Sequence, residues 1–280
     1  MKITLLGTGS PIPDPNRAGP CTLVQAGDRN IMVDCGRGAL MRLMAAGVPP
    51  VLVDTLLITH LHSDHITDVN DLVTTRWVMQ PVHVPLKVYG PPGTTAMFDA
   101  MLRMLELDQQ YRHDHHDDLR ANGPLTVEVT ELGPGETFTI GSATVSTHAT
   151  DHRPVKPTIG FRLEHDGKVV ALAGDTVPCE GVDTMCAGAD AYVQTVIRAD
   201  LVNLVAGMVP TGARFKDILD YHSTVEQAAQ TATRTGVKNL VLTHYVPPLQ
   251  AAQEDEWRAL AAAHFAGNIV LGPDLTSLDL

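Results

Sequence analysis

The chain has 280 residues, 44% hydrophobic and 19% charged, which excludes disorder through low hydrophobicity and allows a large buried core. With 20 Lys and Arg against 32 Asp and Glu, the formal net charge is −12, which disfavours general binding to polyanions but leaves a small anionic substrate open. Histidine is frequent, at 13 residues, and four cysteines form no CxxC pair. The N-terminal residues do not resemble a signal peptide and no apolar run could span a membrane, so we expect a cytoplasmic protein with reduced thiols and no membrane partner.

Short apolar runs alternate with helical patterns along the whole chain, and no linker interrupts them. The first half predicts strands 2–6, 22–25, 30–33, 54–59 and 86–89, and helices 39–46, 69–78 and 95–107. The second half predicts strands 126–130, 137–140, 143–148, 159–164, 169–173, 191–196, 239–243 and 268–271, and helices 224–235 and 254–265. This order favours a single α/β domain over residues 1–280, with two sheets face to face and helices outside them.

A dense group of metal-capable side chains follows predicted strand 54–59 directly. His60, His62, Asp64 and His65 have the spacing HxHxDH, which does not match the three- and four-residue offsets of one helix face. A turn can aim these side chains at one point. Imidazoles and a carboxylate without thiolate fit zinc or a neighbouring transition metal better than calcium or magnesium.

One loop cannot fill two metal shells, so further ligands are expected where later strands end. Three strand ends qualify: Asp151 and His152 follow strand 143–148, Asp175 follows strand 169–173, and His244 follows strand 239–243. Taken singly, Asp175 could be a helix cap, and His152 and His244 could be solvated turn residues. Together they favour a metal site, because the end of a buried strand is a poor place for an unpaired charge.

These stretches resemble the metallo-β-lactamase superfamily, whose four-layer αββα sandwich carries HxHxDH followed by a His, an Asp and a His. Within it the chain is most similar to the ribonuclease Z and arylsulfatase branch. The branch resemblance is carried by the segments LGTGSP at 6–11, VDCG at 33–36, GDTVPC at 174–179 and HST at 222–224. It implies an αββα fold over nearly the whole chain.

The resemblance also implies the ligand sets and a proton donor. It places His60, His62 and His152 on one zinc ion, Asp64, His65 and His244 on a second, and Asp175 between them. Manganese or iron could replace zinc. Two such ions could share a hydroxide that attacks an ester. The family places the residue equivalent to His222 beside the leaving group, so His222 is expected to act as general acid or oxyanion stabiliser, with Asp64 also at the catalytic centre.

Two departures from the ribonuclease Z pattern affect the expected substrate. Gln194 stands where those enzymes usually carry the Glu that partners the catalytic His, and the interval 153–174 leaves no room for their basic tRNA-binding arm. We therefore expect a hydrolase of a small anionic ester, of sulfate, phosphodiester or phosphonate type. The alternative is a ribonuclease Z-type tRNA 3′-processing endonuclease, with tRNA disfavoured, and a lactonase or β-lactamase-like hydrolase comes third. A metal-binding scaffold without turnover is disfavoured, since every ligand and His222 are present.

An extra segment, residues 99–131, holds 3 Arg against 8 Asp and Glu, a net charge of −5. Its His-rich loop could form a lid over the metal centre, in which Arg112, His115 and His116 meet the substrate, or could be a solvated loop without a role. The branch often forms dimers, so a homodimer is possible, and the apolar stretch 69–78 with Trp77 could be its surface or part of the core.

Overall fold

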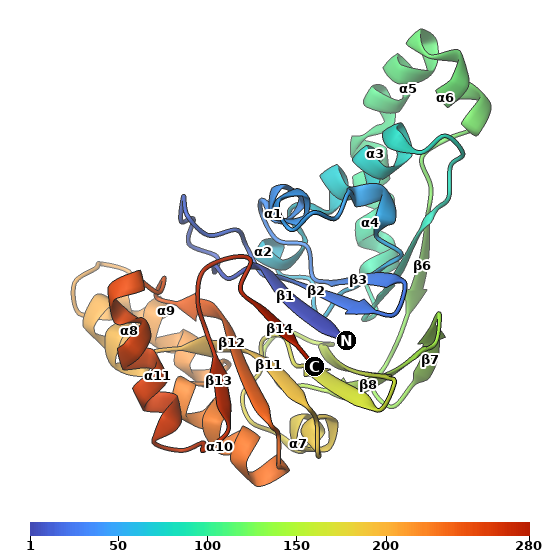
Figure 1. Ribbon diagram of the computed structural model, residues 1–280. Helices are drawn as coiled ribbons and strands as arrows, with labels where there is room; N and C mark the ends of the chain where they lie inside the picture. Colours follow the sequence, from blue (N-terminus) through green and yellow to red (C-terminus); the bar gives the residue numbers. More distant parts are fainter.

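Two seven-stranded sheets form the centre of the molecule, and helices cover their outer faces (Figure 1). The structure is a computed structural model that describes residues 1–280. The first sheet has the order β14 (Ser277–Asp279), β1 (Lys2–Gly7), β2 (Cys21–Ala26), β3 (Arg29–Val33), β4 (Thr55–Leu57), β5 (Leu86–Gly90) and β6 (Val127–Glu131). The second has the order β13 (Asn268–Val270), β12 (Asn239–Val246), β11 (Ala191–Ile197), β10 (Lys168–Leu172), β9 (Ile159–His165), β8 (Ala143–Ala149) and β7 (Thr137–Ile140).

The helices lie in two groups that follow the two halves of the chain (Figure 1). On the first-sheet side are α1 (Ala39–Ala45), η1 (Pro50–Leu52), α2 (Ser63–Ile66), α3 (Val69–Met79), α4 (Thr94–Met104), α5 (Glu106–His115) and α6 (Asp117–Asn122). On the second-sheet side are α7 (Glu180–Cys186), α8 (Ala199–Ala206), α9 (Gly212–Asp217), η2 (Ile218–Asp220), α10 (Val225–Thr235), η3 (Ala251–Gln253) and α11 (Glu254–Ala262). None of them is long and apolar enough to cross a bilayer.

Three layers of apolar side chains hold the sandwich together. Between the sheets, Ile31 and Leu57 of the first sheet join one buried cluster with Phe161 and Val193 of the second. Outside the first sheet, a second cluster joins its strands to α1, α3 and α4, and outside the second sheet a third joins its strands to α7, α10 and α11. Since burying one large aliphatic side chain stabilises a fold by about 1.5–3 kcal/mol, these layers fix the expected αββα architecture, which is confirmed.

Several elements differ from the sequence prediction. The loop expected to carry Arg112 and His115 is helix α5, and α6 to α9 and strand β14 were not predicted. Strand β12 was predicted to end before His244 but continues through it to Val246. The backbone of His244 has a positive φ of 52°, so the strand bends at this residue. Trp77 is fully buried in the cluster outside the first sheet, so the stretch 69–78 belongs to the core and offers no apolar dimer surface there.

Strand direction brings the candidate site together. Strands β3 to β6 run parallel, as do β10 to β13, and β8 shares the direction of β10 because both are antiparallel to β9. The carboxyl ends of β8 and β10 therefore lie at one edge of the second sheet. The loop after β4 meets them there, since His62 Nδ1 lies 3.2 Å from His152 Nε2. This is the edge where parallel sheets commonly present functional loops.

One buried carboxylate ties the C-terminal segment to the N-terminal loop at this edge. Asp274, whose side chain is 4% exposed, accepts hydrogen bonds from the Thr8 backbone N–H (3.0 Å), the Thr8 hydroxyl (2.7 Å), the Ala18 N–H (2.7 Å) and Arg42 Nε (2.9 Å). It therefore fixes both ends of the loop that follows β1.

We expect Asp274→Ala to lower the free energy of unfolding by about 2–4 kcal/mol, because it leaves buried donors unpaired. Urea denaturation followed by circular dichroism measures this loss. Asp28, whose side chain is 79% exposed beside Arg29, provides the control. Asp28→Ala should cost less than a quarter as much, and equal losses for the two variants would contradict the role given to Asp274.

Candidate metal centre

Seven side chains from five segments converge at this edge of the sandwich. His60 and His62 lie in the loop after β4, Asp64 and His65 lie on the single-turn helix α2, His152 follows β8, Asp175 follows β10 and His244 lies on β12. Their ligand atoms form two groups in which all atoms lie within 4.8 Å of one another: a first group of His60, His62, His152 and Asp175, and a second group of Asp64, His65 and His244. The structure thus brings together the seven side chains that the resemblance implies as ligands, whereas Asp151, the neighbour of His152, joins neither group.

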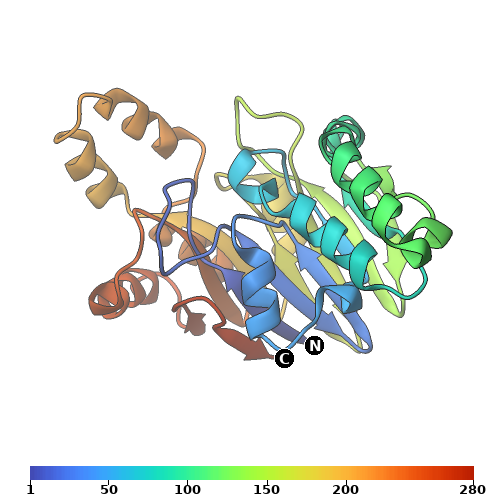
Figure 2. The same cartoon turned by 90° about the horizontal axis from the view of Figure 1, so that it is seen from above.

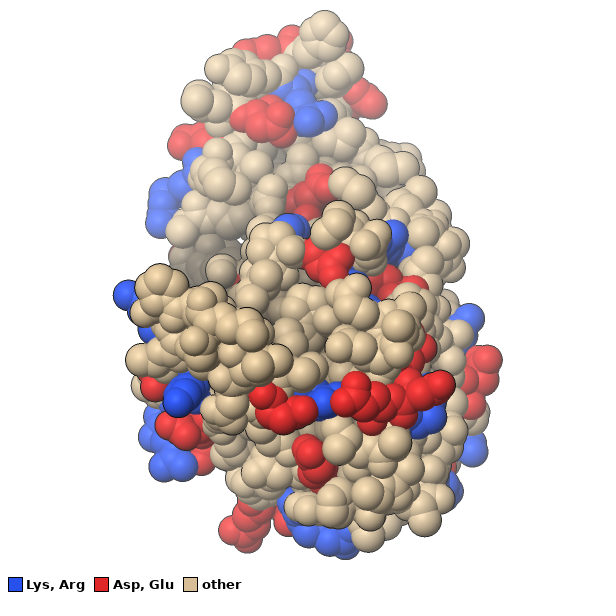
Figure 3. Space-filling view, turned by 90° about the vertical axis from the view of Figure 1, so that its left-hand side faces the viewer, with Lys and Arg blue, Asp and Glu red and all other residues tan.

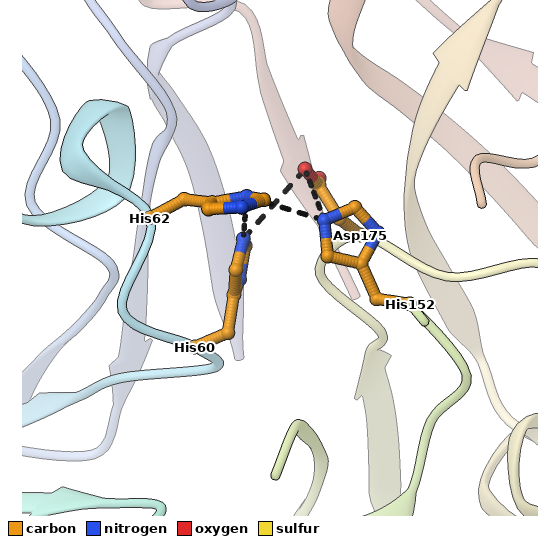
Figure 4. A group of neighbouring side chains, drawn as sticks. All are labelled: His60, His62, His152 and Asp175. Atoms are coloured by element: carbon orange, nitrogen blue, oxygen red, sulfur yellow. Dashed lines mark hydrogen bonds and ion pairs between the residues drawn. The ribbon is translucent and has the colours of Figure 1, made fainter. Parts of the chain in front are cut away.

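Figure 4 shows the side chains of the first group pointing toward one another from two sides of the site. His62 Nδ1 lies 3.1 Å from His60 Nε2 and 3.2 Å from His152 Nε2, and Asp175 Oδ2 lies 3.8 Å from both Nε2 atoms. In a tetrahedral site with bonds of about 2.05 Å, neighbouring nitrogens are roughly 3.3 Å apart. The first group therefore has the spacing of a tetrahedral metal shell.

The hydrogen bonds around the first group determine which nitrogens carry protons. Thr59 Oγ1 donates to Asp34 Oδ2 at 2.8 Å, so His60 Nδ1 must donate to Thr59 Oγ1, at 3.0 Å. His152 Nδ1 donates to the Tyr221 carbonyl at 2.8 Å. Both Nε2 atoms are therefore bare lone pairs directed at the same region, an arrangement that a cation stabilises.

Burial keeps the imidazoles of the first group neutral. It holds the pKa of His60 well below its ordinary value and lowers the pKa of His152 to about 4. Neutral imidazoles are the form that binds a transition metal.

The second group repeats the pattern with a carboxylate as orienting partner. His65 Nδ1 donates to Asp34 Oδ2 at 2.7 Å, which leaves its buried Nε2 without a hydrogen-bond partner, 3.7 Å from Asp64 Oδ2. His244 Nε2 lies 3.2 Å from the same oxygen. Burial alone would lower the pKa of His65, but Asp175 and Asp34 raise it well above its usual range, so a positive charge is favoured here.

Asp175 lies between the two groups. Its Oδ2 is 3.4 Å from His65 Nε2, 3.7 Å from His244 Nε2 and 3.2 Å from His222 Nε2, in addition to its contacts with the first group. Burial would raise the pKa of this carboxyl, but His244 and His65 hold it well below its ordinary value. Its other oxygen, Oδ1, is buried and has no hydrogen-bond partner. An ionised carboxylate with a free oxygen suits a position between two cations.

The donor set therefore fits two divalent ions of the zinc type. Nitrogen and carboxylate oxygen are the ligands, each group offers three or four of them, and the buried Nε2 of His65 and Oδ1 of Asp175 lack any other partner. Three of the imidazoles also have an orienting hydrogen bond, to Thr59, Asp34 and the Tyr221 carbonyl. Such outer partners fix the tautomer and direction of a metal ligand.

Removal of metal should destabilise the protein. Dialysis against a strong chelator is expected to lower the melting temperature by roughly 5–10 °C, since a ligand at 100 times its dissociation constant contributes about 2.7 kcal/mol. Differential scanning fluorimetry measures the shift. Zinc should restore the original value and excess magnesium should not, because magnesium prefers oxygen ligands. An unchanged melting temperature after proven metal loss would contradict the assignment.

His222 lies beside the two groups but belongs to neither. It is 7% exposed, it follows η2, and its Nδ1 donates to the Ile218 carbonyl at 2.9 Å, so its Nε2 faces the centre. Thr224 caps helix α10 through a capping box with Gln227, which fixes the chain just after His222. The imidazole is thus held with Nε2 directed at Asp175, 3.2 Å away.

The residues expected to meet the substrate from segment 99–131 lie elsewhere. Arg112 and His115 are on α5 and His116 follows it, and Arg112 Nε pairs with Asp108 at 2.8 Å. His113 packs edge-on against Trp77 of α3, which fixes the α5–α6 pair to the outer helical layer. Figures 1 and 2 place this pair at one end of the molecule, opposite α8 and α9. None of the three joins either metal-binding group, so their substrate role and the lid remain predictions.

Sequence analysis missed the residues that orient the ligands. Asp34 accepts from Thr59 and His65 and so serves both groups, and the carbonyls of Tyr221 and Ile218 hold His152 and His222. A buried carboxylate at the end of strand 30–33, at the same edge as the HxHxDH loop, was the one available signal. The two carbonyls left no signal, because any residue type provides one.

Gln194 was expected at the position of the Glu that partners the catalytic His in ribonuclease Z enzymes, but its side chain is not hydrogen-bonded to His222. It is buried in β11, where its Nε2 donates to the Thr195 carbonyl (2.7 Å) and the Gly174 carbonyl (3.2 Å), and its Oε1 accepts from Tyr192. It supports the backbone just before Asp175 and makes no hydrogen bond to His222. The orientation of His222 therefore does not depend on a carboxylate at position 194.

Comparisons with known proteins show which families and structures the chain is similar to. The model of a family described as "Beta-lactamase superfamily domain" matches residues 29–245. A protein named Ribonuclease Z from Mycobacterium avium is 54% identical over 277 residues, covering 98% of this chain and 96% of the relative. A protein of that name from Mycobacterium marinum is 51% identical over 282 residues, covering 100% of this chain and 99% of the relative.

Solved structures share the fold at lower identity. The short form of human tRNase Z has a TM-score of 0.72 and 23% identity and covers 100% of this chain and 99% of its own. A metallo-β-lactamase fold protein from Bacillus subtilis, YhfI, has a TM-score of 0.75 and 21% identity and covers 99% of this chain and 98% of its own.

The relatives' shared name contradicts two expectations: a small anionic ester as main substrate and tRNA as disfavoured. Both were wrong for physical reasons. Net charge sums the whole surface, whereas RNA contacts depend on local charge, and Figure 3 shows Lys and Arg interspersed with Asp and Glu on one face. The β9–β10 hairpin does fill the interval expected to hold an arm, but a missing arm excludes only one way of holding tRNA.

Proposed function

Because the chain belongs to the β-lactamase superfamily and, within it, to the ribonuclease Z family, it is a metal-dependent hydrolase of ester bonds, and we propose that it cleaves precursor tRNA as a 3′-processing endonuclease. The observation that carries the proposal is the 54% identity over 277 residues to a protein named Ribonuclease Z. The intact pair of metal-binding groups and the placement of His222 support it, because a phosphodiester cut needs both charge neutralisation and a proton donor.

The proposed metal complement is two zinc ions, one per group, with Asp175 between them. Bound divalent ions would supply Lewis-acid polarisation of the phosphoryl oxygens and would lower the pKa of a nearby water. Asp34 and Thr59 keep the imidazoles of His65 and His60 in the tautomer that leaves Nε2 bare. The chain thus prepares the centre through hydrogen bonds rather than through charge alone.

Two residues are proposed to move the protons of the reaction. His222 delivers a proton from Nε2 to the leaving oxygen, since its Nδ1–H is engaged by the Ile218 carbonyl. Asp64 is held ionised: burial would raise the pKa of this carboxyl, but the hydrogen bond from His244 and the nearby His65 keep it below its ordinary value. An ionised Asp64 can orient a water and accept its proton while serving as a ligand.

A cleavage assay with precursor tRNA tests the proposal directly. Purified protein with its metal restored is incubated with a precursor that carries a 3′ trailer, and with bis-p-nitrophenyl phosphate. We expect cleavage of the precursor at a single site near the 3′ end of the mature tRNA, at nanomolar protein. The same tRNA without a trailer is the control. Hydrolysis of the small diester without any cut in the precursor would contradict the proposal.

The cellular location, the oligomeric state and the domain bounds are also proposals. All four cysteines are free in the structure, which is compatible with the expected cytoplasmic location. A homodimer is proposed from the resemblance alone. The single domain over residues 1–280, with segment 99–131 as an accessory part, remains a prediction.

A further inference from the structure

A small pocket opens beside the metal centre on the side of His222. Its volume is about 230 Å³, and it lies between the loop that follows β1 and the segment from α9 to η2. Figure 2 shows α8 and α9 projecting from the sandwich near that N-terminal loop. Among the lining residues are Ser10, Ile12, Arg214, Phe215, His222 and His244.

The lining combines an apolar wall with unpartnered polar atoms. Ile12, Phe215, Ile218 and Val246 supply the wall. Ser10 is 1% exposed, and its Oγ is buried without a hydrogen-bond partner. Nδ1 of His244 is also buried without one, unlike the orienting nitrogens of His60, His65 and His152. Buried polar atoms normally have partners, and both of these atoms belong to residues that line the pocket, which points to a polar ligand group at this wall.

Resting on the proposed function, we propose that this pocket binds the nucleobase of the nucleotide that carries the leaving oxygen, stacked on Phe215 and hydrogen-bonded by Ser10. His222 lines the pocket and also faces Asp175 Oδ2 at 3.2 Å. A general acid must reach the leaving oxygen, so the leaving nucleotide departs on the side of His222, where the pocket lies.

The chemistry of the wall matches a nucleobase. A flat aromatic base stacks on an aromatic ring whatever its sequence, and such a contact contributes about 1–3 kcal/mol. The Ser10 hydroxyl can donate to a ring carbonyl or accept from an exocyclic amine. Arg214, exposed at the pocket, brings a positive charge toward the adjoining phosphate.

The decisive experiment compares a precursor carrying a base at the leaving nucleotide with one that is abasic there. Phe215→Ala should lower kcat/KM about tenfold or more on the base-bearing substrate and leave the abasic substrate unchanged within about twofold. Phe215→Trp, which keeps a stacking ring, should retain activity within about threefold. Leu204→Ala, on the neighbouring helix α8 at a side chain 56% exposed, is the matched control and should behave as wild type. Equal losses on both substrates would overturn the stacking contact.

Ser10→Ala provides a second, independent readout. It should change the order of preference among the four bases at that nucleotide by about 2–10-fold, which is the range of one hydrogen bond, without changing the metal content. Unchanged base preference would remove Ser10 from the proposal. Circular dichroism and metal analysis of each variant exclude misfolding as the cause of a loss.

A binding measurement separates this inference from the proposed function. Titration calorimetry on the metal-restored protein compares cytidine 3′- and 5′-monophosphates with ribose phosphates that lack the base. The base should tighten binding about tenfold for at least one of the two nucleotides, and Phe215→Ala should remove that gain. If the protein cuts no precursor but shows this gain in affinity, the proposed tRNA processing is wrong and the nucleobase pocket is supported. If it cuts precursor but shows no gain and no abasic effect, the pocket assignment is wrong.

Discussion

Asp175→Asn is expected to lower precursor cleavage by about 10³-fold and to reduce bound metal well below two equivalents per chain. The carboxylate lies within 3.8 Å of five imidazole nitrogens, those of His60, His65, His152, His222 and His244. Asparagine keeps the size and one oxygen but removes the negative charge. Because removing one partner of a buried charged pair costs about 3–5 kcal/mol, a loss of that order in metal binding and turnover follows.

Metal analysis by mass spectrometry and single-turnover cleavage measure these two effects separately. Asp151→Asn is the matched control, since Asp151 also follows β8 but pairs with Arg153 at 2.6 Å outside the centre. That variant should keep its metal and most of its activity. Two full equivalents of metal together with wild-type turnover in Asp175→Asn would show that the carboxylate does not join the two groups.

His222→Ala is expected to lower turnover of precursor tRNA by about 10²-fold or more while the metal content stays unchanged. The reason is its position: Nε2 faces the centre, but His222 belongs to neither metal-binding group. Bis-p-nitrophenyl phosphate should lose much less activity, because p-nitrophenolate leaves without a proton. A loss of similar size on both substrates would argue against proton donation to the leaving oxygen.

His222→Gln separates the two roles considered for this residue. Glutamine can donate a hydrogen bond but cannot transfer a proton at neutral pH. If His222 is the general acid, the Gln variant should be as slow as the Ala variant and should lose the limb of the pH–rate profile that the acid produces. Substantial recovery in the Gln variant would instead assign His222 to oxyanion stabilisation.

The metal-capable residues could be predicted from the sequence, but the groups that orient them could not. His60, His62, Asp64 and His65 are close in sequence, so a strand followed by a short turn brings them together by local geometry. His65 and its partner Asp34 are 31 positions apart, and His152 and the Tyr221 carbonyl are 69 apart. No periodicity links such pairs, so orienting contacts of this kind become visible only once the sheets are assembled.

Some helices could not be predicted from the sequence because tertiary contacts fix their positions. Segment 106–115 is rich in polar and charged residues and buries none of them, so it lacks the apolar stripe by which an amphipathic helix is identified. Contacts with other segments hold this helix in place: His113 packs on Trp77, and Gln109 Oε1 accepts a hydrogen bond from the Leu125 N–H at 3.0 Å. The α8–α9 segment follows β11 directly, and Arg214 and Phe215 of α9 line the pocket only because the fold places them beside the loop after β1.

The sequence by itself determined the sandwich, the edge at which the loops gather and the identity of the metal-capable residues, because strand patterns and ligand spacing are local properties. It did not determine the substrate, since net charge and two departures from a family pattern say little about local surface chemistry. Tertiary structure alone decided which nitrogens stay bare, how His222 is held without a carboxylate at position 194, and that Ser10, Phe215 and His222 line one pocket. The physical reason is that tautomers and pockets are set by contacts between segments far apart in the chain, which only folding brings together.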